Sequence, residues 1–112
     1  MWAAFSSIDA VVIRIIDETL VSVFGVAVRD NVYRALMTQF SVRREEMAGQ
    51  LDAFQTLLEK GFGPRTAKVL SRGIAKRLYS ELHLTFVENP TFGLPEYLEE
   101  AKSTVSRGRE SG

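Results

Sequence analysis

Apolar residues recur three and four positions apart along most of the chain, the spacing that places side chains on one side of an α-helix. Breaks in this pattern separate five segments that we expect to be helices, at 6–24, 28–40, 51–61, 64–82 and 95–105. No segment alternates convincingly between apolar and polar residues, and the run 82–87 is the only place where a strand could form. The pattern predicts an all-α fold, a single compact bundle of about five helices, with a short turn or strand-like linker near 83–94.

Local signals indicate where these helices begin and end. Ser6 can cap the first helix, with Asp9 three positions later completing a capping box. Gly25 can end that helix in the left-handed conformation. The stretch from Gly61 to Pro64 contains a second glycine and then a proline, which suits the first position of a helix, so we expect a tight corner there. We expect one domain over residues 1–112, ordered from about 5 to 105, with a frayed tail at 106–112.

The expected core combines the apolar sides of three of these helices. On a helical wheel the 64–82 segment gathers its aliphatic residues opposite its basic residues, and the first and third helices each carry an apolar face. We expect the following residues to be buried together: Ile16, Leu20, Phe54, Leu58, Leu70, Ile74 and Leu78.

The first helix carries apolar residues on more sides than one neighbour can cover. About half of its circumference is strongly apolar, and Val11 and Val21 stand among the polar residues of the other half. We therefore expect it to be either the central helix or a dimer element. In a symmetric homodimer, Arg14 of one copy would face Asp17 or Glu18 of the other. The candidate dimer contacts are Val11, Arg14, Glu18 and Val21.

Composition excludes several classes of protein. The 112 residues are 46% hydrophobic and 25% charged, which is typical of a globular domain. Fourteen Lys and Arg residues balance fourteen Asp and Glu residues, so no net charge attracts nucleic acid or an anionic membrane. The absence of cysteine excludes disulfides and thiolate sites. The N-terminal apolar stretch is interrupted by Asp9 and Arg14, which argues against a signal peptide or a membrane span, so we expect a cytoplasmic location.

The segment 64–82 carries a basic stripe, which we define as Arg65, Lys68, Arg72 and Lys76, continued by Tyr79. These residues lie close together on a helical wheel, and such a ridge can contact a phosphate backbone or an acidic partner. The alternative is an ordinary solvated helix face, and the neutral composition favours it. No Asn or Gln stands beside the arginines to make bidentate base contacts, so sequence-specific reading of nucleic acid is not indicated.

No constellation of residues matches known catalytic or cofactor chemistry. His83 is the only histidine, and its spacing from Glu81 and Glu88 fits no metal motif. No oxyanion-hole or elbow sequence surrounds Ser71 or Ser80. The corner at 63–66 can offer helix amides to an anion, but it matches neither the dinucleotide fingerprint nor the phosphate loop. We predict no catalytic, cofactor or metal residue, and we do not expect an enzyme.

The order of landmarks resembles the archaeal Nitrosopumilus output-domain family. The resemblance covers roughly residues 8–105 and rests on SVRREEM, on LDAFQTLLEKGFGPRTAKVLSRGIAKRLY and on PTFGLPEYLEEAK. It implies a small helical module at the output end of signalling chains, without catalytic residues to carry over. The corner from Phe62 to Lys68 is one residue longer than the family's pattern and contains Pro64.

These observations favour a non-enzymatic binding and regulatory module that acts through protein–protein contacts as a homodimer. The alternative is a nucleic-acid-binding protein that uses the basic stripe of the 64–82 helix. Neither function requires a cofactor or a membrane.

Overall fold

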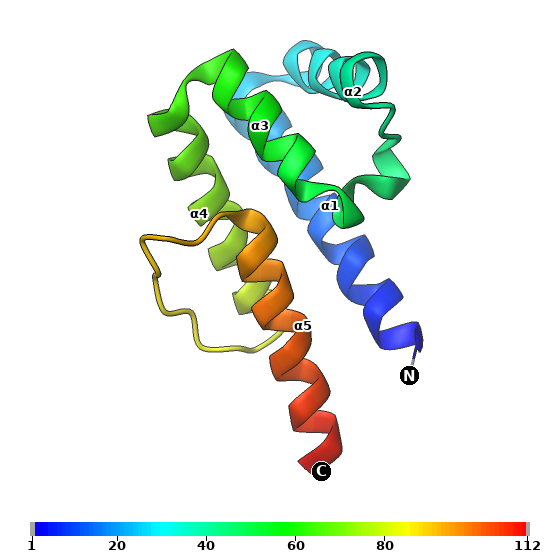
Figure 1. Ribbon diagram of the computed structural model, residues 1–112, viewed down its shortest axis with the longest axis vertical. Coiled ribbons are helices and arrows are strands. Elements are labelled where there is room, and N and C mark those ends of the chain that lie inside the picture. The colour runs from blue at the N-terminus through cyan, green and yellow to red at the C-terminus, as the bar shows by residue number, and fades with distance from the viewer. Residues whose placement is uncertain (1, 112) are drawn as a thin grey trace.

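The computed structural model describes the backbone of residues 2–111 and the side chains of residues 8–107. It contains α1 (Trp2–Phe24), α2 (Val26–Phe40), the 3-10 helix η1 (Arg44–Gly49), α3 (Leu51–Phe62), α4 (Pro64–Glu81) and α5 (Leu94–Ser111) (Figure 1). No strand occurs within this described backbone, and residues 84–93 form an irregular loop in place of a strand-like linker. The predicted all-α bundle is confirmed. No helix of the described part is long and apolar enough to cross a bilayer.

Helix α1 is the central element of the bundle. It packs against α2, η1 and α4, and Figure 1 shows it running behind α3. Its residues Ile15, Ile16 and Leu20 are completely buried, because these neighbours cover its apolar side. All seven residues of the predicted core are buried in one cluster. Of the two roles expected for the first helix, the structure shows the central one.

Two Phe-Gly corners lie side by side at one end of the bundle. Gly25 joins α1 to α2, and Gly63 joins α3 to α4. Both glycines have positive φ, with φ and ψ of 92° and 169° at Gly25 and 88° and 157° at Gly63, a region that is essentially restricted to glycine. Gly25 therefore ends α1 as expected but with an extended ψ, outside the left-handed helical region. The preceding rings, Phe24 and Phe62, stack with centroids 4.4 Å apart and planes 8° apart.

Two predicted helix ends are wrong. Helix α1 begins at Trp2, so Ser6 lies inside the helix and does not cap it, and the Ser6 side chain lies outside the described residues. Helix α5 continues to Ser111, beyond the predicted end near residue 105. Within its last described turns, the Arg107 guanidinium donates to the hydroxyls of Ser103 and Thr104, one turn earlier, which favours continuation of the helix.

Ion pairs connect α1 to the two helices that follow the second corner. Arg14 pairs with Glu81, and Arg77 pairs with Glu18 at 2.6 Å, which is the pattern of antiparallel neighbours. Lys102 of α5 lies 2.7 Å from Asp9 of α1. These ion pairs attach α4 and α5, which also pack against each other, to the central helix.

Candidate functional site

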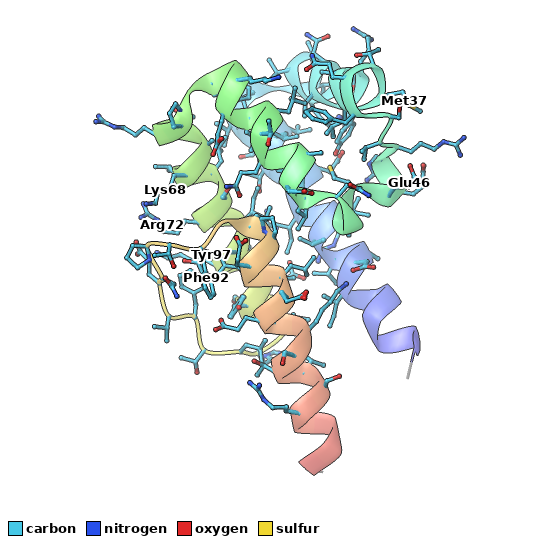
Figure 2. All side chains as sticks on the ribbon, in the orientation of Figure 1. Met37, Glu46, Lys68, Arg72, Phe92 and Tyr97 are labelled. Atoms are coloured by element: carbon cyan, nitrogen blue, oxygen red, sulfur yellow. The ribbon has the colours of Figure 1, made fainter. Side chains whose placement is uncertain are left out.

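The basic stripe is partly covered by the loop that follows α4. The Lys68 ammonium donates to the Pro90 carbonyl oxygen at 3.2 Å, and the Arg72 guanidinium pairs with the Glu88 carboxylate at 2.9 Å. Figure 2 shows Lys68 and Arg72 projecting from α4 on the side where this loop passes. Arg65 and Lys76 are exposed, and neither has an ion pair with another described side chain. Half of the predicted ridge therefore has partners within the chain.

Tyr79 does not continue the exposed stripe, which corrects the prediction made from the helical wheel. The side chain is 3% exposed, because α5 and the loop cover this side of α4. Its hydroxyl lies 2.8 Å from the Tyr97 carbonyl oxygen and 2.7 Å from the Glu100 carboxylate. Burial, and then the Glu100 carboxylate, raise the pKa of Tyr79. Tyr79 is a structural tyrosine that fixes α5 on α4.

An aromatic cluster holds the loop in place. The Tyr97 ring lies 5.2 Å from both the Phe86 ring and the Phe92 ring, and the Tyr97 hydroxyl accepts a hydrogen bond from the Asn89 amide at 2.9 Å. The loop leaves α4 through His83, which is exposed and has φ of 59°. The Leu84 amide donates to the Tyr79 carbonyl oxygen at 2.8 Å, the long bond that typically closes a helix end of this kind.

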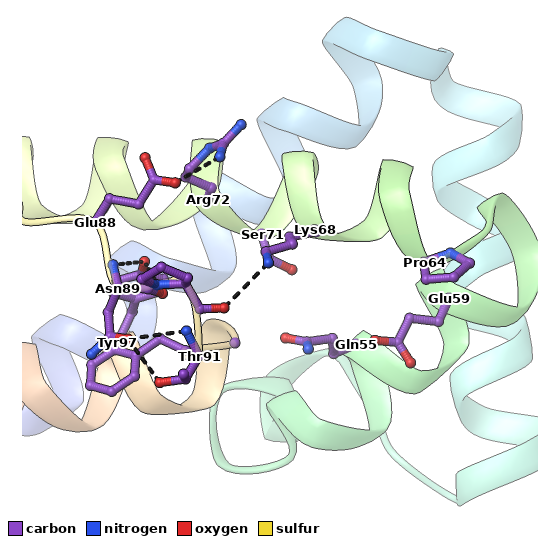
Figure 3. A pocket seen from close by; sticks show the side chains of 13 residues that line it. Gln55, Glu59, Pro64, Lys68, Ser71, Arg72, Glu88, Asn89, Thr91 and Tyr97 are labelled. Atoms are coloured by element: carbon purple, nitrogen blue, oxygen red, sulfur yellow. Dashed lines mark hydrogen bonds and ion pairs between the residues drawn. The ribbon is translucent and has the colours of Figure 1, made fainter.

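Between α3, α4 and the loop lies a cavity of about 260 Å³, which we call the loop cavity (Figure 3). Ser71 is the one polar residue in the described part that is counted as buried, with 4% exposure, and it faces this cavity. Its hydroxyl has no hydrogen-bond partner among the described residues. Buried hydroxyls are usually paired, so an unpaired one that lines a cavity suggests that something else supplies the partner.

Gln55 of α3 is fixed beside the same cavity. Its Oε1 accepts a hydrogen bond from the Leu94 amide at 2.8 Å. The carboxamide lies directly on Gly93, where an added Cβ would stand 2.6 Å from Nε2 and from Oε1. A side chain at position 93 would therefore displace the Gln55 carboxamide. Sequence reasoning did not select Gln55 or Gly93, because nothing in their local pattern signals that α3 meets the loop.

The predicted dimer contacts of α1 are used within the chain. Arg14 binds Glu18 and Glu81, and Glu18 also binds Arg77 of α4. The Arg77 hydrogen bond lowers the pKa of Glu18, and the Glu81 carboxylate raises the pKa of Arg14. Val11 packs against the core and Val21 is half-buried. The charged groups on this flank of α1 therefore have partners within the bundle, although the Arg14 and Glu18 side chains are still 46% and 47% exposed.

Asp17, the other expected partner of Arg14, also has intrachain partners. The Tyr33 hydroxyl donates to Asp17 at 2.9 Å, and Arg29 lies 3.4 Å from the same carboxylate. Burial, and then Asp17, raise the pKa of Tyr33 to about 12. These bonds attach α2 to α1 through the inner side of α2.

The outer side of α2 is a face that the bundle leaves open, with two exposed apolar residues on one helix. Val26 is 52% exposed and Met37 is 45% exposed. They are eleven positions apart, which is three helical turns, so they lie on one stripe. Asp30 and Arg34 stand between them and are both exposed. We call these four residues the α2 stripe; Figure 2 shows Met37 at the edge of the molecule.

Two candidates remain, an anion site at the 63–66 corner and a metal site. The Gly63 amide donates to the Glu59 carbonyl oxygen at 2.9 Å, so it belongs to the α3 end and is not free for an anion. In the part of the chain whose side chains are described, no three His, Cys, Asp or Glu residues gather where a metal ion would bind.

No protein-family model, curated protein or solved structure matches this chain. The resemblance to the archaeal output-domain family stays a prediction, and function is argued from the residues themselves.

Proposed function

We propose that this chain is a non-enzymatic binding and regulatory module that acts through protein–protein contacts as a homodimer joined along α2. One observation carries the proposal: the α2 stripe is exposed, apolar at both ends and oppositely charged in the middle. A role at the output of a signalling chain rests on the resemblance described above.

The stripe is complementary to itself. A two-fold axis near the middle of α2 would bring the two helices together in antiparallel orientation, as symmetric interfaces require the same patch on both copies. Val26 of one copy would then meet Met37 of the other, and Asp30 would meet Arg34. The buried apolar residues at the two ends would supply attraction between the copies, and the opposite charges in the middle would align the two helices.

This surface suits a dimer better than the predicted α1 surface does. The polar groups of Arg14 and Glu18 already have partners within the chain, so a second copy would have to displace those bonds. Among the residues whose side chains are described, Asp30 bonds only to the adjacent Arg29, and Arg34 bonds only to Asn31 one turn away. Such exposed local bonds contribute little and are exchanged at little cost.

Sedimentation of the parent chain and of Val26→Glu with Met37→Glu at micromolar concentration tests the proposal. The parent should sediment as a dimer and the double variant as a monomer, because the variant places uncompensated carboxylates at both ends of the interface. Val69→Glu is the matched control, since Val69 is 53% exposed on α4, away from α2. A monomeric parent contradicts the proposal.

Nucleic-acid binding through the basic stripe is the weaker alternative. Lys68 and Arg72 have partners in the loop, and only Arg65 and Lys76 are left to neutralise phosphates. Each neutralised phosphate contributes to the salt dependence of affinity, so two contacts would give weak binding with a shallow dependence on salt. A salt titration with a labelled duplex distinguishes the two functions.

A further inference from the structure

We propose that the loop cavity is a binding site for the carboxylate group of a small organic acid with a short apolar chain. The inference does not depend on the homodimer, since α2 does not line the cavity. It rests on three side chains from two helices that line the cavity and carry hydrogen-bond donors: Ser71, Lys68 and Gln55 (Figure 3).

Ser71 supplies the clearest sign of a ligand. A hydroxyl within a helix can satisfy itself on the carbonyl one turn earlier, but Ser71 Oγ makes no such bond, although its residue is only 4% exposed. An unpaired buried hydroxyl is unfavourable, whereas alanine at the same place would have no polar atom to satisfy. An acceptor that enters the cavity would remove this cost.

Lys68 supplies the positive charge. Its ammonium group has three donor hydrogens, and the structure gives it one partner, the neutral carbonyl of Pro90 at 3.2 Å. Two hydrogens therefore remain for a ligand. The bond to Pro90 also holds the ammonium at the cavity wall, so binding does not have to order a long flexible side chain.

Gln55 supplies a third donor in a fixed position. Because its Oε1 is occupied by the Leu94 amide, the Nε2 group is the part of the carboxamide that is left to donate. The hydrogen bond from Leu94 holds the carboxamide beside the cavity. Hydroxyl, ammonium and amide donors together match the acceptor atoms of a carboxylate.

Charge and volume distinguish a carboxylate from a phosphate. Arg72 is neutralised by Glu88, and Glu59 at the rim adds a negative charge, so Lys68 is the one cation of the cavity wall without an acidic partner. With one unpaired positive charge and one negative charge at the rim, the cavity should bind a ligand that carries one negative charge more readily than a ligand that carries two. The rings of Pro64, Pro90 and Phe92 form apolar walls, and a cavity of about 260 Å³ admits only a small molecule.

Amide chemical shifts of the isotope-labelled protein, titrated with sodium butyrate at constant ionic strength, test the site. We expect saturable shifts of the Gly93 and Thr91 amides. Ser71→Ala removes a neutral donor and should weaken binding about 2- to 10-fold. Lys68→Met removes a charged donor and should weaken binding more than about 10-fold. Lys76→Met is the matched control, because it removes a lysine from the same helix outside the cavity and should leave binding unchanged.

A second measurement on Ser71→Ala distinguishes a loss of binding from a loss of folding. Its melting temperature should equal or exceed that of the parent, because the variant removes an unpaired buried hydroxyl. The site is overturned if butyrate gives no saturable shift, or if Lys76→Met weakens binding as much as Lys68→Met does. Saturable shifts with sodium phosphate at lower concentration than with butyrate overturn the choice of a carboxylate. None of these results bears on the oligomeric state, so this proposal and the homodimer fail separately.

Discussion

The stacked rings of Phe24 and Phe62 should couple the stabilities of the two corners. The ring centroids lie 4.4 Å apart in nearly parallel planes, although 38 positions separate the two residues in sequence. Such pairs contribute about 0.5–1.5 kcal/mol beyond the apolar area that each ring buries. Both rings are only partly buried, so each single change to alanine should cost roughly 2–3 kcal/mol, less than the 3–5 kcal/mol typical of a fully buried phenylalanine.

A double-mutant cycle measured by urea denaturation isolates the coupling. The double variant should lose about 0.5–1.5 kcal/mol less than the sum of the single losses, because the stacking interaction can be removed only once. Phe24→Ala combined with Phe86→Ala is the control, since Phe86 belongs to the loop cluster and the two losses should add. Additive losses for Phe24 and Phe62 would refute the side-by-side arrangement of the corners.

Two further predictions concern the core and the tyrosines. Ile74→Ala should lower the free energy of unfolding by ~2–5 kcal/mol, because Ile74 is completely buried. Val69→Ala, on the exposed side of α4, should change it by less than about 0.5 kcal/mol. Equal effects of the two variants in urea denaturation would contradict the assignment of the buried and exposed sides of α4. The free energy of unfolding should fall as pH rises above about 10. In the unfolded chain the tyrosines release their protons near that pH, whereas in the folded chain burial raises the pKa of Tyr33 to about 12 and also raises the pKa of Tyr79. A Tyr33→Phe, Tyr79→Phe variant should lose less stability over that pH range, and an unchanged slope would show that neither hydroxyl is protected.

The corner between α3 and α4 and the core were predictable because their signals are local. Gly63 followed by Pro64 marks a corner whatever surrounds it, and the burial of Ile74 follows from the apolar side of its own helix. The start of α1 was not predictable from Ser6, because a good capping residue also occurs inside helices when the preceding residues extend the pattern.

The surfaces were less predictable, since each depends on segments far away in the chain. Tyr79 falls on the same side of the wheel as the basic residues, and only the path of the loop and α5 buries it. Arg14 and Glu18 looked like a free polar flank because their partners, Glu81 and Arg77, follow more than fifty residues later. The loop cavity has the same origin, since it exists only where α3, α4 and the loop meet.

Charge reversal on the α2 stripe tests the central proposal, a two-fold dimer along α2, most directly. Asp30→Arg should dissociate the dimer, because the new arginine of each copy would face Arg34 of the other copy. Arg34→Asp should also dissociate it, because the new carboxylate of each copy would face Asp30 of the other copy. Combining the two changes restores opposite charges across the axis and should restore the dimer in sedimentation equilibrium. Both residues are exposed, so the folded monomer should be unaffected. A parent dimer that survives each single reversal, or a combined variant that stays monomeric, would contradict the antiparallel pairing of α2.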